Sequence, residues 1–259
     1  MKKLDSNCMD FGDKPKSGIK IVKGNYGECR FCDNMDQEHG LPSLSDQSFN
    51  LCLTDPPYNV KAKPHSQAKK KKDHDIGYND NIKNYNEFSL TWFNYIIRIS
   101  KGLIFTPGNP NLQMWYDLTT PRDILIHYKK NGAGYTSMVM QNRFDSILVY
   151  GKFNRRFMNN VYECSLDNGF LRLPIDLKHP HPKSIKLWYA IIKDAIPTSV
   201  IDPFLGSGTT AEVCEARGIP WLGFELMEEY APDIEKRIQR GILKKKHAKK
   251  QQTLFPVSK

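Results

Sequence analysis

Three acidic residues each follow a short apolar run that is typical of a buried strand. In an open α/β sheet, ligands bind outside the carboxyl ends of the strands, so we expect the three carboxylates to converge on one crevice. Each could accept hydrogen bonds from hydroxyl or amino groups of a ligand. They are Asp55 after Phe49–Leu53, Asp202 after Ser199–Ile201, and Glu225 after Trp221–Phe224.

A glycine pattern follows the second of these carboxylates. Gly206 and Gly208 form Gly-x-Gly-x-x-Ala after a strand and at the start of a helix, and Glu225 lies 19 positions after Gly206 (225 minus 206). Glycines let the backbone turn tightly under a ligand, and an acid on the next strand accepts hydrogen bonds from ribose hydroxyls. The segment lacks the Gly-Lys-Ser/Thr ending of a P-loop, which disfavours NTP hydrolysis.

The tetrapeptide Asp55-Pro56-Pro57-Tyr58 indicates a different chemistry. The two prolines stiffen the strand exit and hold the Asp55 carboxylate and the Pro56 carbonyl as fixed acceptors. An exocyclic base nitrogen is a poor nucleophile because its lone pair is delocalised into the ring. Two acceptors that bind its hydrogens favour the nucleophilic form and stabilise the positive charge that develops on it. Tyr58 offers a face for an extruded base.

The elements that must position these residues alternate between strands and helices, which predicts an α/β fold with a mostly parallel sheet. Apolar stripes at helical spacing predict helices over Tyr85–Ile99 and Ser184–Ile196. Cys52 and Cys214 are expected in the core. Besides the three strands above, the sequence predicts strands at Leu103–Thr106, Ile124–Tyr128 and Ser146–Tyr150.

Charge and length bound the remaining possibilities. The chain has 259 residues, a net charge of +10 and no long apolar run, so we expect one cytoplasmic domain with no membrane segment. Nine cations and no acid lie between Lys236 and Lys259, and a second basic run lies within residues 61–72. Both runs favour a polyanion partner. Cys29 and Cys32 form a lone CxxC pair without regular zinc spacing, and no metal is expected.

The motifs together resemble the DNA amino-methyltransferases in their β-class order, in which the catalytic motif precedes the cofactor motif. The resemblance extends from about Gly27 to Ile238. It implies a single Rossmann-like methyltransferase domain with circularly permuted motif order, S-adenosylmethionine as the cofactor, and DNA as the substrate. It also implies a prokaryotic or phage source and a nucleoid-associated location.

The resemblance also implies roles for individual residues. Asp55, Pro56, Pro57 and Tyr58 would hold the target amino group and base. The resemblance assigns the cofactor to Phe204, Gly206 and Gly208, with Asp202 and Thr209 near its methionine end, Glu225 at its ribose, Lys183 at its carboxylate, and Glu28 and Cys29 near its adenine. Asn142–Asp145 would flank the pocket of the target base.

Three features depart from the family pattern. His181, Pro182 and Ser184 replace family residues near Lys183, Glu28 stands where the family has Asp, and the segment expected for target recognition, residues 151–178, is short. We therefore expect a flexible arm over residues 1–20, a methyltransferase domain over 21–240 with a mobile basic loop at 61–81, and a flexible basic tail over 241–259. Gln251–Phe255 resembles the peptides that dock on sliding clamps.

Several alternatives stay open at this point. Asp55 favours adenine N6 as the methylated atom, because serine is commoner at that position in cytosine-N4 enzymes. A nicotinamide-dependent oxidoreductase would explain Gly206 to Glu225 and leave Asp55 to Tyr58 unexplained. An inactive DNA-binding protein on the same fold is a third reading. A homodimer is one alternative for the oligomeric state.

Overall fold

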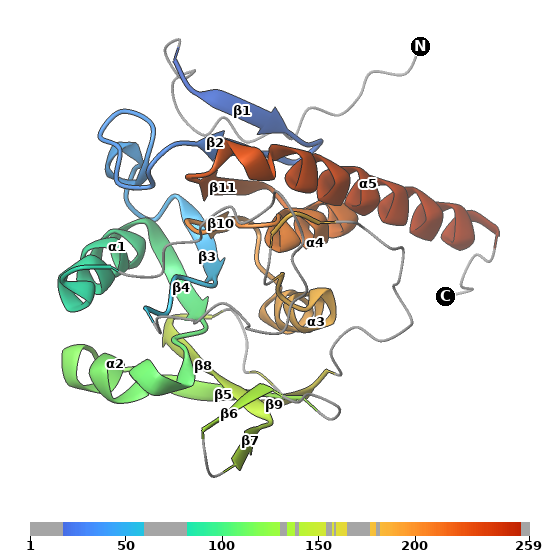
Figure 1. The fold of residues 1–259 in the computed structure, drawn as a ribbon. Coiled ribbons are helices and arrows are strands. Elements are labelled where there is room, and N and C mark those ends of the chain that lie inside the picture. The colour runs from blue at the N-terminus through green and yellow to red at the C-terminus, as the bar shows by residue number, and fades with distance from the viewer. Residues whose placement is uncertain are drawn as a thin grey trace, which may run out of the picture.

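The computed structural model describes residues 18–59, 82–129, 134–137, 140–153, 157, 159–164, 177–179 and 182–254. Through these residues runs a nine-stranded sheet with the order β1-β2-β11-β10-β3-β4-β8-β5-β9 (Figure 1). The strands are β1 (Lys20–Lys23), β2 (Gly27–Phe31), β3 (Phe49–Thr54), β4 (Ser100–Phe105), β5 (Asp123–Tyr128), β8 (Phe144–Gly151), β9 (Val161–Glu163), β10 (Val200–Asp202) and β11 (Trp221–Glu225). A separate pair joins β6 (Gly134–Ser137) to β7 (Met140–Asn142).

The sheet is mostly parallel, as the sequence predicts. Strands β2, β11, β10, β3 and β4 run parallel to one another, and so do β5 and β9. The pairs β1/β2, β4/β8 and β5/β8 are antiparallel. The carboxyl ends of β3, β10 and β11 therefore meet at one edge, which is where the site residues lie.

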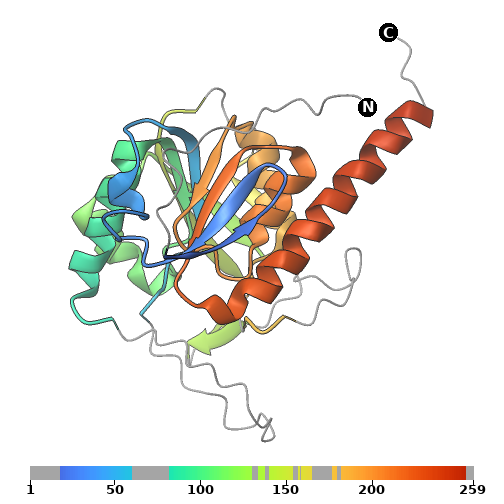
Figure 2. The ribbon, with the colours of Figure 1, turned by 90° about the horizontal axis from the view of Figure 1, so that it is seen from above.

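Helices cover both faces of the sheet. They are α1 (Tyr85–Ile99), α2 (Leu112–Leu118), α3 (Ile185–Ala195), α4 (Thr209–Arg217) and α5 (Ala231–Leu254), with short 3-10 turns η1 (Leu41–Ser43), η2 (Asn109–Asn111) and η3 (Glu228–Tyr230). Figure 2 shows α1 and α2 on one side of the sheet and α3, α4 and α5 on the other. Each face has its own apolar core.

The apolar stripes of the sequence form these cores. Trp92, Ile96 and Ile99 of α1 are buried, and Trp92 packs edge to face on Phe105 and Trp115 at ring-centroid distances of 5.3 and 5.5 Å. On the other face, α3 buries its own stripe, including Trp188, Ile191 and Ile192. Burial of such side chains stabilises the fold by about 1.5–3 kcal/mol each.

The predicted elements agree closely with the observed ones. The helix expected over Tyr85–Ile99 has those bounds, and each of the six predicted strands overlaps an observed strand, with shifts of one to three residues at the ends. Cys52 and Cys214 are fully buried, as expected. No sequence pattern predicted β1, β2, β9, the β6/β7 pair, α2 or the long α5.

The expectation of a flexible tail from residue 241 is wrong for residues 241–254, which continue α5. The helix persists because it packs on α4. The ammonium of Lys244 lies 2.6 Å from the buried Glu212 carboxylate, and Gly241 fits closely against the Glu212 carbonyl. In Figure 2 the far end of α5 extends beyond the rest of the domain.

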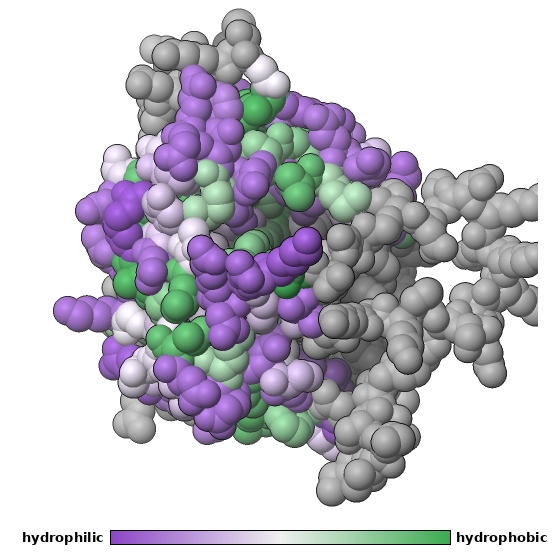
Figure 3. Space-filling model, turned by 60° about the vertical axis from the view of Figure 1, so that its left-hand side comes forward, coloured by the Kyte–Doolittle hydropathy of each residue, from purple (hydrophilic) through white to green (hydrophobic). Residues whose placement is uncertain are grey.

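The other predicted segments are described only in part. The basic loop 61–81 lies outside the described residues, as do residues 1–17 of the predicted arm; Lys20 already belongs to β1. Within residues 151–178, strand β9 adds an edge to the main sheet beside β5. None of the described helices combines the length and apolar character needed to cross a membrane. On the face seen in Figure 3, hydrophobic residues gather in patches among hydrophilic ones.

Candidate active site

The Asp55–Tyr58 motif directly follows β3, which lies between β10 and β4 in the sheet. Thr54, the last residue of β3, donates a hydrogen bond from Oγ1 to Asp202 Oδ1 at 2.6 Å. This bond connects the strand that carries the tetrapeptide to the strand that carries the glycine loop. The structure thus brings the two predicted motifs, separated by about 150 residues in the sequence, to one edge of the sheet.

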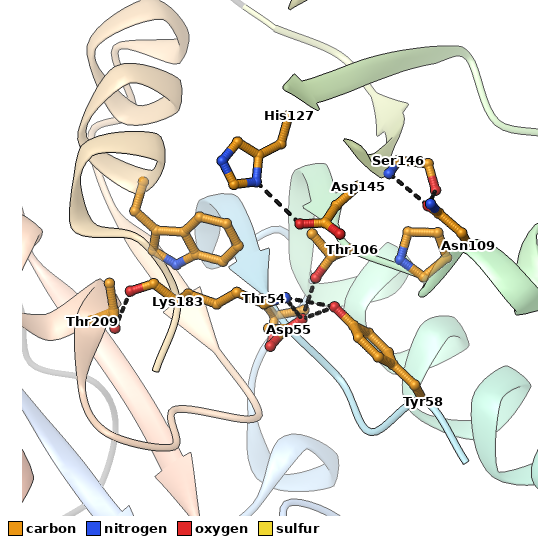
Figure 4. A network of polar contacts seen from close by, with 12 residues as sticks. Thr54, Asp55, Tyr58, Thr106, Asn109, His127, Asp145, Ser146, Lys183 and Thr209 are labelled. Atoms are coloured by element: carbon orange, nitrogen blue, oxygen red, sulfur yellow. Dashed lines mark hydrogen bonds and ion pairs between the residues drawn. The ribbon is translucent and has the colours of Figure 1, made fainter. Parts of the chain in front are cut away.

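The Asp55 carboxylate is the centre of a compact polar cluster (Figure 4). Its Oδ1 accepts hydrogen bonds from the Tyr58 hydroxyl at 2.5 Å and from the Thr106 hydroxyl, and the Lys183 ammonium lies 3.0 Å from the same oxygen. Lys183 also donates to the Tyr58 hydroxyl at 2.7 Å. One carboxylate oxygen therefore receives three donors, from three separate segments of the chain.

The protonation states in this cluster follow from its charges. Burial and the negative charge of Asp55 raise the pKa of Tyr58 well above its usual value, so its hydroxyl stays protonated. Burial alone would lower the pKa of Lys183, but the nearby Asp55 and Tyr58 outweigh it and raise that pKa. At neutral pH the cluster contains an ammonium and a neutral phenol.

Side chains from other segments of the chain bind the backbone carbonyls of the Asp55–Tyr58 motif. Tyr85 of α1 donates from its hydroxyl to the Pro57 carbonyl at 2.7 Å, and Asn111 of η2 donates from Nδ2 to the Tyr58 carbonyl at 2.8 Å. Gly108 lies against the Tyr58 ring with φ +73°, and a Cβ there would come within 2.8 Å of the ring. These contacts fix both the peptide and the ring of the motif.

The glycine loop follows β10 and leads into α4. Gly206 and Gly208 have φ values of +54° and +85°, a region that favours glycine. The Gly206 amide donates to Glu225 Oε2 at 2.8 Å, and the Met227 amide donates to Glu225 Oε1 at 2.9 Å. Glu225 is thus joined to the loop, and burial raises its pKa to about 7.

Asp202 is buried and already hydrogen-bonded within the protein. Its Oδ1 accepts from Thr54 and from the Phe204 amide, and its Oδ2 accepts from Thr210 Oγ1 at 2.5 Å. Burial raises the pKa of Asp202 to about 6, although these hydrogen bonds oppose the shift. In this arrangement Asp202 sets the shape of the loop.

The remaining predicted residues lie at different depths. Phe204 packs against Trp92 at a centroid distance of 5.5 Å, and Thr209 is buried at the start of α4. Glu28 and Cys29 lie on β2 beside Leu222 and Gly223, before the carboxyl end of the sheet. Glu28 pairs with Arg30 at 3.0 Å, and Cys29 is fully buried. Burial, followed by the negative charge of nearby Glu225, raises the pKa of the Cys29 thiol, so this residue lies on the Glu225 side of the site.

Several residues that hold the site were not predicted from the sequence. Thr106 follows β4, the neighbour of β3, so strand adjacency could have revealed it. Tyr85, Gly108 and Asn111 gave no comparable signal, because they act on backbone atoms and a ring of a motif that is distant in sequence. Near the cluster, Asp145 binds His127 at 3.1 Å and Lys129 at 2.8 Å (Figure 4).

Two sequence comparisons indicate the class of protein that this chain resembles. The N6/N4 methyltransferase family model, described as DNA methylase, matches residues 157–236. The type II methyltransferase M.HpaI of Haemophilus parainfluenzae is 24% identical over 235 residues, which are 76% of this chain and 70% of that protein.

Solved structures of similar fold include two methyltransferases. The PvuII cytosine-N4-specific DNA methyltransferase has a TM-score of 0.59 at 16% identity, covering 86% of this chain and 93% of its own. The M1.HpyAVI complex with SAM has a TM-score of 0.52 at 18% identity, and the match covers 74% of this chain and 89% of M1.HpyAVI. The chain is thus similar to the N6/N4 DNA methylases over residues 157–236, to a curated type II methyltransferase over most of its length, and to solved methyltransferases in its fold.

Proposed function

We propose that this protein transfers a methyl group from S-adenosylmethionine to the exocyclic N6 of adenine in DNA, after the base has flipped out of the duplex. The observation that carries the proposal is the position of the Asp55–Tyr58 motif, which lies at the same edge of the sheet as the glycine loop and Glu225. A base acceptor and a cofactor bound at these two motifs would face each other.

The residues of the loop fit the cofactor. Both glycines have positive φ, and a Cβ would lie 3.1 Å from His179 Nε2 at Gly206 and 3.2 Å from Ile234 Cα at Gly208, so a larger residue at either position would strain the loop. Glu225 would accept hydrogen bonds from the ribose hydroxyls. Gly206, Gly208, Asp202 and Thr209 would surround the methionine part. When bound, S-adenosylmethionine supplies a methyl group on a positively charged sulfur.

The motif itself supplies the acceptors for the target amino group. Asp55 and the Pro56 carbonyl would bind its two hydrogens, and the neutral Tyr58 would stack on the base. Tyr85 and Asn111 hold the next two carbonyls, so the acceptors are positioned before the substrate arrives. Positioning of this kind supplies much of the rate in a direct methyl transfer.

Cytosine N4 is the second candidate for the methylated atom. The same two acceptors suit either base, and the PvuII neighbour is named as specific for cytosine N4. Asp55 favours adenine. The test uses tritium-labelled methyl donor and DNA digested to nucleosides: N6-methyladenine as the dominant product supports the proposal, and N4-methylcytosine would replace it with the second candidate. Sequencing of modified bases in DNA from expressing cells would give the recognition site.

Calorimetry separates the broader alternatives. Binding of S-adenosylmethionine without binding of NAD is expected. The opposite result would favour an oxidoreductase, whereas cofactor binding without methyl transfer to any DNA would favour an inactive DNA-binding protein.

A further inference from the structure

The Lys183 ammonium lies where the target amino group is needed. Its Nζ is 3.0 Å from Asp55 Oδ1 and 2.7 Å from the Tyr58 hydroxyl. An ammonium and an exocyclic amine are both nitrogen donors, and both require an acceptor such as this carboxylate. The two groups therefore draw on the same carboxylate, of which Lys183 occupies Oδ1.

The charges of the two groups bear on this shared carboxylate as well. The nitrogen of the base becomes positive during methyl transfer, and a positive charge is stabilised by a carboxylate and destabilised by a nearby cation. Because Asp55 raises the pKa of Lys183, the side chain carries its charge at neutral pH. A reacting base beside Asp55 is consequently disfavoured while the ammonium stays on Oδ1.

The position of Lys183 allows it to move. Its side chain is 22% exposed and that of Asp55 is 26% exposed, so both are partly accessible to solvent. Lys183 precedes the first residue of α3, Ile185, by two positions and is not fixed by the helix. A second carboxylate, Asp145, lies on the same side of the site, and its charge acts on Lys183 (Figure 4).

We propose that Lys183 is a positioning residue that takes the place of the target amino group in the free protein and leaves Asp55 when the base enters. This inference rests on the proposed function. It implies that part of the binding free energy of the target base is spent on displacing the ammonium. A base without an amino group could bind while Lys183 stays on Asp55.

The test measures DNA binding without cofactor. Two fluorescein-labelled duplexes carry the recognition site read from modified DNA, one with the target adenine and one with purine, which lacks the amino group, in its place. Lys183→Met is expected to bind the adenine duplex about tenfold more tightly than the wild type, the scale of a displaced charged hydrogen bond. Its affinity for the purine duplex should change less than about twofold.

A double-mutant cycle assigns the effect to Asp55. In an Asp55→Asn background, Lys183→Met should produce no selective gain for the adenine duplex. Lys193→Met, which removes an exposed lysine at the other end of α3, is the matched control for loss of charge. Lys183→Gln provides a second uncharged variant, and thermal unfolding establishes that each variant folds.

The outcomes are separable. An equal gain for both duplexes, no gain, or a gain that persists without Asp55 would overturn the role of Lys183. If wild-type protein neither bound S-adenosylhomocysteine in calorimetry nor methylated DNA, the proposed function itself would fail.

Discussion

Thr54 and Asp202 form a 2.6 Å hydrogen bond that joins the strand before the catalytic motif to the strand before the glycine loop. Both side chains are buried. Asp55 directly follows Thr54, and the loop with Gly206 and Gly208 begins after Asp202, so the bond holds the starts of the two motifs together. In a direct transfer, the distance between the two motifs decides whether the two reacting atoms meet.

Asp55→Ala is the first test of the catalytic assignment. The variant should lose at least about two orders of magnitude in methyl transfer, because one acceptor for the developing positive charge is absent. S-adenosylmethionine should still bind, as calorimetry would report. Near-normal turnover would remove Asp55 from the mechanism.

Gly208→Val should have the reverse effect. Gly208 has φ +85°, and even a Cβ would lie 3.2 Å from the α5 backbone at Ile234, so a branched side chain must distort the loop. Cofactor binding should fall below detection in calorimetry. Gly18→Val is the matched control, because a Cβ there meets no atom within 4 Å; equal loss in both variants would contradict the role of the loop.

Thr106→Val tests the support of the carboxylate. Thr106 is buried and donates its hydroxyl hydrogen to Asp55, and valine keeps the shape without the donor. We expect kcat to fall about tenfold, the effect of one lost hydrogen bond to a charged group, with an unchanged cofactor Kd. Thr106→Ser should restore most of the rate. A rise in the cofactor Kd with an unchanged kcat would show that Thr106 supports the cofactor site and not Asp55.

Strand adjacency separates the residues that the sequence could predict from those that it could not. Asp55, Asp202 and Glu225 follow apolar strands, so their common edge could be predicted from the pattern alone. Strand β2 could not be predicted, because the charged residues Glu28 and Arg30 interrupt its five residues and leave no apolar run. In the folded chain these two charges pair with each other. The long α5 was missed because its stability comes from the buried Glu212 on another helix, a partner that local composition does not reveal.

The pH dependence of cofactor binding should report Glu225. Burial raises its pKa from an ordinary 4.5 to about 7, and ribose hydroxyls bind the charged form better. Affinity measured by calorimetry should therefore rise as pH increases from 6 to 8, and Glu225→Gln should flatten the rise. Unchanged pH dependence in the variant would assign the titration to another group.

The free energy of unfolding should change with pH in the opposite direction to cofactor affinity. The folded protein holds the proton of Glu225 up to about pH 7, whereas the unfolded chain loses it near 4.5, so the free energy of unfolding falls as pH rises between these values. Denaturant unfolding of the wild type and of Glu225→Gln would measure the contribution. A steeper fall in the variant would contradict it.

A deletion that tests the basic tail must begin after residue 245, because the preceding residues of α5 pack on α4. Gly241 and Lys244 pack on α4 through Glu212, so deletion from residue 241 would damage the domain. Deletion of residues 246–259 keeps all three cations that bind Glu212 and removes Lys246, Lys249, Lys250 and Lys259.

Loss of these four lysines should weaken binding to all DNA sequences alike, because phosphate contacts carry no sequence information. The slope of log affinity against log salt should fall in magnitude by up to about 3 to 4, through fewer released counterions. Site choice and cofactor affinity should stay nearly unchanged. If the truncated protein kept the full salt slope, the tail would not be a DNA arm. The clamp-like Gln251–Phe255, of which residues 251–254 belong to α5, would then be tested by pull-down with a sliding clamp.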